Sequence, residues 1–148
     1  MQSRPWQRHY DFQVPETMKY PRIPAGEFLI LASKLYPDKT ALDFYGTRTT
    51  FWELRKKVLA MAGVMSEMGV KKGDRVAIHL PNSPQYVIAF YASLMLGATV
   101  VNLNPMYTAD ELTAICENTG VTTLFSFDMV LPHIRAVTER IDVPRVII

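Results

Sequence analysis

The feature that most limits the fold of this chain is a regular alternation, from residue 75 onward, of short apolar runs with longer segments of helical spacing. The apolar runs predict strands at about residues 75–80, 98–103, 121–126 and 145–148. The segments between them predict helices at about residues 84–96, 109–119 and 129–140. Strands that alternate with helices of this length form crossover units, so the strands are parallel and helices cover both faces. The right-handed crossover rule then predicts an α/β fold with an open, doubly wound parallel sheet.

Local signals mark where the helices begin and end. Thr50 with Glu53 predicts a capping box that opens a helix over about residues 51–68. Thr108 with Glu111 predicts the same at residue 109, and Ser83 is placed to cap the helix that starts at Pro84. Gly69, Gly97 and Gly120 follow predicted helices and suit their carboxyl ends.

The segment before the alternation predicts a helix and a hairpin. Phe28, Leu31, Ala32 and Leu35 recur at helical spacing within residues 25–36. Residues 41–45 then alternate in polarity, Gly46-Thr47 forms a turn, and residues 48–50 return as a short partner strand.

The first 24 residues predict an extended arm. Four prolines exclude a continuous helix and a central strand there. The aromatic residues Trp6, Tyr10 and Phe12 fit an arm that lays its rings on another surface, and a partly ordered terminus is the alternative. The expected organisation is therefore an arm at residues 1–24 and part of an α/β subdomain at residues 25–148.

Composition narrows the functional classes. The formal net charge is only +2 and the basic residues are scattered, which argues against a nucleic-acid surface. The single Cys116 excludes an internal disulfide and indicates a reducing, cytoplasmic location. No signal peptide is predicted at the amino end. The apolar stretch at residues 86–101 is shorter than the ~20 residues that a membrane-spanning helix needs.

Several segments, in order and in register, resemble the opening of long-chain fatty-acid–CoA ligases, which belong to the AMP-forming adenylating enzymes. They are residues 4–6 (RPW), 9–10 (HY), 14–15 (VP), 50–54 (TFWEL), 69–77 (GVKKGDRVA), 80–86 (LPNSPQY) and 101–112 (VNLNPMYTADEL). The resemblance covers essentially the whole chain. It implies that the parent protein uses fatty acid, ATP, Mg²⁺ and CoA, and makes acyl-CoA, AMP and pyrophosphate through an acyl-adenylate.

The resemblance also implies that this chain is inactive by itself. In the family, the phosphate-binding loop, the magnesium carboxylate, the ribose-binding aspartate and the catalytic lysine lie beyond the equivalent of Ile148. We therefore assign no catalytic, cofactor-binding or metal residue to this chain. Two alternatives stay open: a ligase for an aryl or a short- or medium-chain acid, and a stand-alone flavodoxin-like interaction module. An independent module should close its last strand with a helix, and this sequence stops within a predicted strand.

Local look-alikes of catalytic motifs have structural explanations. Residues 46–50 have the composition of a phosphate loop but lack its second glycine and lysine, so we interpret them as the hairpin turn. Gly73-Asp74 lacks the threonine of the family's ribose-binding motif and is interpreted as a loop entering the sheet. His79 is expected to be a hydrogen-bonded core residue. Asn82 and Asn104 follow strand ends, where parallel sheets bind ligands, but are expected to shape loops.

Two elements are candidate subunit contacts. The last predicted strand carries Val146, Ile147 and Ile148, and exposed strand edges pair with other chains. The arm, with Trp6, Tyr10 and Phe12, is the second element. We therefore expect a homo-oligomer, because the edge near Val143 is expected to lack a covering segment. Peripheral membrane contact is a further option.

Overall fold

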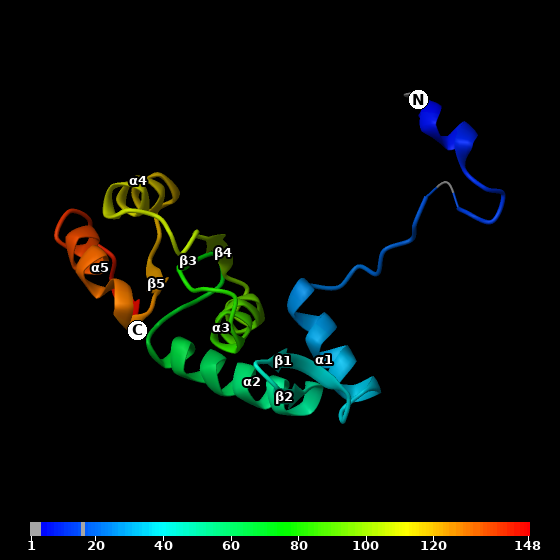
Figure 1. Ribbon diagram of the computed structural model, residues 1–148, viewed down its shortest axis with the longest axis horizontal. Coiled ribbons are helices and arrows are strands. Elements are labelled where there is room, and N and C mark those ends of the chain that lie inside the picture. The colour runs from blue at the N-terminus through cyan, green and yellow to red at the C-terminus, as the bar shows by residue number, and fades with distance from the viewer. Residues whose placement is uncertain (1–3, 16) are drawn as a thin grey trace.

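The computed structural model describes residues 4–15 and 17–148, and its centre is a four-stranded sheet. The strands are β3 (Arg75–Ile78), β4 (Thr99–Asn102), β5 (Thr123–Phe125) and β6 (Arg145–Ile147). Their order is β4-β3-β5-β6 and all three pairings are parallel. The predicted parallel sheet is confirmed (Figure 1).

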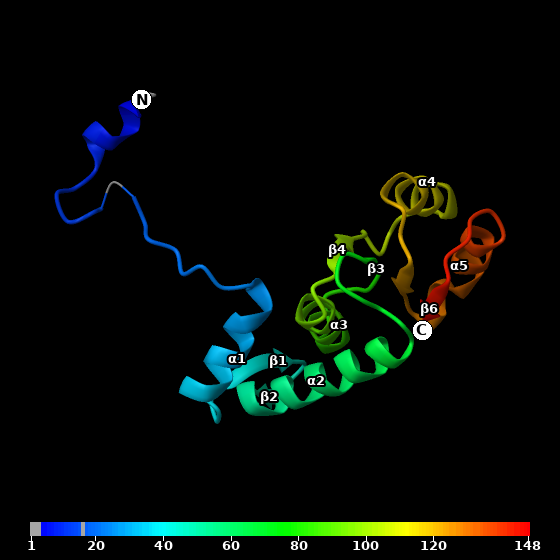
Figure 2. The same cartoon turned by 180° about the vertical axis from the view of Figure 1, so that it is seen from behind.

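The two faces of the sheet are covered by different helices, as a doubly wound fold requires. On one face, Ala77 pairs with Val101 and Leu124, and these side chains pack beneath α4 (Ala109–Thr119) and α5 (Leu131–Thr138). The other face carries Val76 and Ile78 against α2 (Phe51–Glu67) and α3 (Pro84–Met95). Figures 1 and 2 show the two helix layers on opposite sides of the strands.

The predicted helix caps are formed. The Thr50 hydroxyl accepts from the Glu53 amide at 3.2 Å, and the Glu53 carboxylate accepts from the Thr50 amide at 2.8 Å. Thr108 and Glu111 form the second capping box in the same way. The amide hydrogen bonds from the two threonines lower the pKa of both glutamates, because they favour the ionised carboxylate. The Ser83 hydroxyl accepts from the Tyr86 amide at 3.3 Å and so begins α3.

The helix and the hairpin before the sheet are confirmed, but the helix buries an unexpected side. Helix α1 (Ala25–Leu35) precedes the antiparallel pair β1 (Thr40–Phe44) and β2 (Thr47–Thr50). The apolar stripe of Phe28, Leu31 and Leu35 is exposed. The buried side presents Gly26, Leu29 and Ser33 instead. A β-carbon at Gly26 would lie 3.4 Å from the Leu94 backbone, so small residues let α1 approach α3 closely.

Three predicted segments differ in detail. Strand β3 stops at Ile78 and β5 spans only three residues, because pairing ends where the chain turns into the loops that follow them. The helix expected at residues 129–140 begins as the 3₁₀ helix η2 (Asp128–Val130), since Pro132 cannot donate to the preceding turn. In the arm, Pro5–His9 forms the 3₁₀ helix η1, where extended structure was expected.

Candidate functional site

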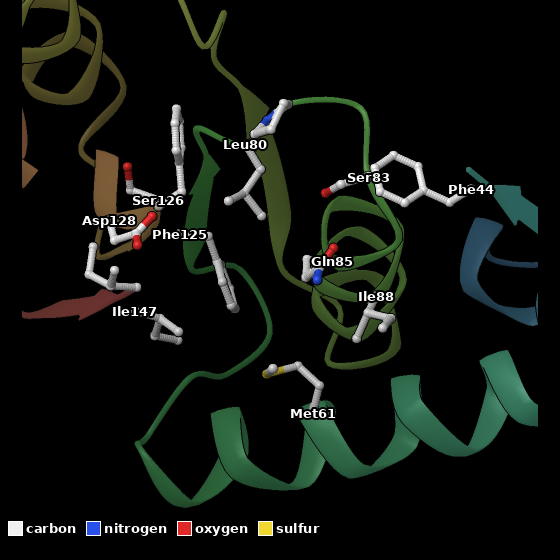
Figure 3. A pocket seen from close by; sticks show the side chains of 13 residues that line it. Phe44, Met61, Leu80, Ser83, Gln85, Ile88, Phe125, Ser126, Asp128 and Ile147 are labelled. Carbon is white, nitrogen blue, oxygen red and sulfur yellow. The ribbon is translucent and has the colours of Figure 1, made fainter. Parts of the chain in front are cut away.

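A cavity of about 580 Å³ lies between the sheet and the helices α2 and α3. It opens at the carboxyl ends of β3, β5 and β6 (Figure 3). Its lining is mainly apolar and consists of Phe44, Met61, Leu80, Pro81, Ile88, Phe125, Phe127, Ile147 and Ile148, with the polar residues Ser83, Gln85, Ser126 and Asp128. An apolar wall with a few polar groups suits a ligand that is mostly hydrocarbon and has one polar end.

The strand order explains why the hollow lies at this place. The chain moves from β3 to β4 on one side and then crosses to β5 on the other side of β3. At such a reversal the loops that follow the two central strands separate, and open parallel sheets bind their ligands in this crevice. Leu80 and Pro81 leave β3 here, and Ser126 to Asp128 leave β5. A smaller hollow of about 300 Å³, lined in part by Asn82 and Tyr86, lies between the hairpin and the start of α3.

His79 links the ends of β3 and β5 and is buried, as expected of a core histidine. Its Nδ1 lies 3.1 Å from the Ser126 hydroxyl, and its ring is 5.8 Å from that of Phe127. Burial lowers the pKa of His79 because it disfavours the imidazolium form, and the Pro105 and Asn104 backbone only partly opposes this. Its Nε2 has no hydrogen-bond partner among the described residues.

The other polar residues that the sequence singled out shape the loops. The Asn104 side-chain oxygen accepts from the Met106 amide at 3.0 Å. Asp110 forms an ion pair with Arg140, and Glu111 belongs to the capping box with Thr108. Gly46 lies in the hairpin turn with a positive φ of 83°, and Gly73 turns the chain into β3 with a φ of 88°. Over residues 4–15 and 17–148, no group of three metal-ligating side chains occurs.

Sequence reasoning missed the polar groups of the cavity. Ser126 and Asp128 directly follow β5, and the signal that could have found them is their place after a predicted central strand. Another missed contact joins α3 to the end of β4: the Tyr86 hydroxyl donates to the Asn102 side-chain oxygen at 2.9 Å.

The candidate contact residues differ in exposure. In the arm, Trp6, Tyr10 and Phe12 are all exposed, Phe12 at 91%. In β6, Val146 and Ile147 are half-buried, and Ile148, which follows this strand, is exposed. The expectation of an uncovered edge at Val143 is wrong, because this residue is buried beneath α4 and α5. Within the described residues, no helix is both long and apolar enough to cross a bilayer.

Comparison with known proteins gives a consistent result. The family described as AMP-binding enzyme matches residues 31–148. A long-chain-fatty-acid–CoA ligase of Bacillus subtilis is 37% identical over 133 residues, which cover 89% of this chain and 24% of that protein. A Mycobacterium tuberculosis ligase named for a 7a-methyl-dioxo-octahydro-indenyl propanoyl group is 42% identical over 100 residues, or 68% of this chain and 20% of that protein.

Solved structures agree with these relatives. A long-chain-fatty-acid-CoA ligase from Archaeoglobus fulgidus superposes with a TM-score of 0.83 at 30% identity, over 93% of this chain and 29% of that one. A Mycobacterium tuberculosis fatty acyl CoA synthetase gives a TM-score of 0.78 at 27% identity, over 84% of this chain and 26% of that one. The chain thus spans about a quarter of the length of the curated relatives it matches.

Proposed function

This chain belongs to the AMP-binding enzymes, and we propose that it is the amino-terminal part of an ATP-dependent fatty-acid–CoA ligase. The ligase would convert fatty acid, ATP and CoA to acyl-CoA, AMP and pyrophosphate through an acyl-adenylate. The observation that carries the proposal is the 37% identity to a long-chain-fatty-acid–CoA ligase over 133 residues. The mainly apolar cavity at the carboxyl edge of the sheet supports a substrate rich in hydrocarbon.

ATP, Mg²⁺ and CoA are proposed as requirements of the longer enzyme. The described residues contain no group of three metal-ligating side chains. The proposed contribution of residues 25–148 is scaffold, as part of the subdomain that positions the remainder of the enzyme. The arm at residues 1–24 is proposed as a separate element that precedes this subdomain.

A ligase for another carboxylic acid is the second candidate. The 42%-identical Mycobacterium tuberculosis relative is named for a fused-ring propanoyl group, so this type of scaffold also occurs with a bulkier acid. The two candidates differ in the shape of the acid rather than in the reaction. The match to a family of enzymes over residues 31–148 disfavours the stand-alone interaction module.

A thioester assay tests the proposed function on the full-length protein that contains this chain. Palmitate, octanoate, benzoate and an indenyl propanoate are supplied separately with ATP, Mg²⁺ and CoA, and AMP and acyl-CoA are measured. We expect the highest kcat/KM with palmitate. A preference for benzoate or for the fused-ring acid would favour the second candidate, and no AMP formation with any acid would refute both.

The 148-residue chain alone is expected to be inactive. Removing one donor that stabilises the transition state costs on the order of 10²–10³ in rate, and here the family's whole set would be missing. We expect no fatty-acid-dependent exchange of labelled pyrophosphate into ATP by the purified chain. Exchange above a no-enzyme control would contradict this.

We also propose a cytoplasmic homo-oligomer. The single, buried Cys116 supports a reducing compartment. The edge of β6 supports self-association, because Ile148 is 56% exposed beside the half-buried Val146 and Ile147. The arm residues Trp6, Tyr10 and Phe12 are a second candidate contact. Light scattering should report a dimer or larger species that Ile148→Asp converts to monomer, and a monomeric parent chain would refute self-association.

A further inference from the structure

Two hollows of this chain share one side wall. The cavity of about 580 Å³ and the smaller hollow of about 300 Å³ are both lined by Phe44 and Ser83. Phe44 is the last residue of β1 and Ser83 caps α3, so the shared wall lies where the hairpin meets the start of that helix. In Figure 3 the Phe44 ring lies beside Ser83, across the cavity from Ile147. The size of the Phe44 side chain therefore determines how far the two hollows are separated.

The hairpin turn holds the Phe44 ring in this wall. Tyr45 and Gly46 have positive φ angles of 50° and 83°, as in the two-residue turns whose twist matches that of the paired strands. Leu42 and Phe44, two positions apart on β1, both face the smaller hollow, whereas Tyr45 in the turn is 95% exposed. The rings of Phe44 and Tyr45 meet edge to face, with their centroids 4.6 Å apart. The backbone of the turn and the neighbouring ring thus fix the position of Phe44.

The carboxylates that line the two hollows are already hydrogen-bonded. In the smaller hollow, the Asp43 carboxylate accepts from the Arg48 Nε at 3.1 Å and from the Gly46 amide at 3.2 Å. In the larger one, the Asp128 carboxylate accepts from the Met129 amide at 2.9 Å. The rest of the lining is mainly apolar on both sides of the shared wall. Space at this wall therefore suits hydrocarbon rather than a further charged group.

We propose that Phe44 determines the shape of the acid that the ligase accepts. With the phenyl ring in place, the larger hollow suits an unbranched hydrocarbon chain and the smaller hollow stays separate. A shorter side chain joins the two hollows and makes room for a ring system. The inference rests on the proposed function, because it takes the acyl part of the substrate as the occupant of the cavity.

The volumes of the hollows support one occupant rather than two. Pockets for small molecules usually have volumes of about 300–1,000 Å³. The larger hollow lies well within this range, and the smaller one, at its lower limit, is better suited as a side extension than as a separate site. A single methylene group in an apolar pocket changes the selectivity of an enzyme by about 10–200-fold. Removing a phenyl group should therefore change measurably which acid is used.

The ratio of kcat/KM for two acids tests the inference on the full-length protein that contains this chain. Palmitate represents the unbranched chain, and an indenyl propanoate represents the ring system. Phe44→Ala should raise the ratio of indenyl propanoate to palmitate by at least about tenfold, and Phe44→Leu should raise it less. Tyr45→Ala is the matched control, because this neighbouring residue lines neither hollow, and it should keep the parent ratio.

Binding to the 148-residue chain separates acid recognition from catalysis. The fluorescent, unbranched cis-parinaric acid is added to the parent chain and to each variant, and the indenyl propanoate is used to displace it. The concentration that displaces half of the probe should fall about tenfold in Phe44→Ala and stay unchanged in Tyr45→Ala. Phe44→Leu keeps an apolar side chain on the hairpin and should shift the displacement in the same direction, so it carries the test if Phe44→Ala does not fold.

The two assays distinguish failure of the inference from failure of the proposed function. No AMP formation with any acid, together with the expected displacement, would refute the proposed function and still support Phe44 as the wall that selects the acid. An active Phe44→Ala enzyme with the parent ratio would overturn the inference whatever the displacement result, because another part of the enzyme would then fill the hollow. The absence of saturable cis-parinaric acid binding, or an equal shift in Tyr45→Ala, would also overturn it.

Discussion

The two ends of the four-stranded sheet are built differently. At the amino end, arginines from the first residues of strands bind helix termini. The Arg75 Nε donates to the Gly120 carbonyl at 2.6 Å, at the end of α4. From β6, the Arg145 Nε donates to the Met68 carbonyl at 2.6 Å and its Nη2 to the Gly69 carbonyl at 3.1 Å, at the end of α2. Positive groups thus meet the negative ends of two helix dipoles.

At the carboxyl end, the loops diverge and leave a hollow. Helix α3 begins there, and the cavity of about 580 Å³ separates it from the ends of β5 and β6. One buried contact, between His79 and Ser126, bridges the two central strands. The amino end therefore contributes stability, whereas the carboxyl end leaves a crevice of the kind in which open parallel sheets bind ligands.

The largest effect on stability should come from removing the arginine hydrogen bonds at the amino end of the sheet. Arg145→Met removes bonds to the Met68, Gly69 and Thr122 carbonyls, and we expect a loss of about 2–3 kcal/mol in the free energy of unfolding. Urea denaturation measures this. Arg22→Met, at an exposed position of the arm, is the control and should change it by less than about 0.5 kcal/mol. Equal effects of the two substitutions would contradict the role of Arg145.

A methyl group at the end of α4 should have the next largest effect. Gly120 has a φ of 64°, and a β-carbon there would lie 3.2 Å from the Arg75 Nη2. Gly120→Ala should therefore destabilise the protein by about 1–2 kcal/mol. Gly63→Ala is the matched control, because that glycine lies within α2 with open space around it, and it should stabilise by about 0.5–1 kcal/mol. Urea denaturation of both variants measures the two changes, and an equal or more stable Gly120→Ala chain would contradict the prediction.

The kinds of element and their order were predictable because their signals are local. The capping residues Thr50 and Glu53 are three positions apart, and the apolar period of each segment is read within one turn or strand. The arginine bridges were not predictable in this way. Arg145 and Met68 are 77 positions apart, and their contact depends on the placement of β6 in the sheet.

The buried side of α1 and the cavity were missed for related reasons. Helical spacing identified α1 through Phe28, Leu31 and Leu35. The face that is buried against neighbouring helices instead holds Gly26 and Ser33. The Ser33 hydroxyl can be buried because it donates to the Ile30 carbonyl at 2.8 Å. The cavity follows from β5 lying beside β3, and periodicity says nothing about the order of strands.

The buried His79 at the carboxyl end of the sheet should make the stability of the chain depend on pH. Burial lowers the pKa of His79 below its ordinary value of 6.5 in the folded chain. As pH falls below about 6.5, the unfolded chain therefore takes up a proton that the folded chain does not, so stability decreases with acidification. We expect the free energy of unfolding, measured in urea from pH 8 to 5, to fall less steeply in His79→Gln than in the parent chain.

His9→Gln is the control for this experiment, since His9 lies exposed in the arm. It should keep the pH dependence of the parent chain. An identical slope in the parent chain and in His79→Gln would show that protonation of His79 does not contribute.

The smallest effect should come from the open part of the carboxyl end. Gln85 is exposed, its side chain lines the cavity (Figure 3), and no hydrogen bond of that side chain occurs among the described residues. Gln85→Leu removes an amide that leaves no buried group unsatisfied, and it adds an apolar side chain of similar length to an apolar wall. The free energy of unfolding should therefore stay within about 0.5 kcal/mol of the parent value in urea denaturation. A loss as large as that of Arg145→Met would mean that the carboxyl end is as tightly organised as the amino end, because only a side chain with buried partners can cost that much.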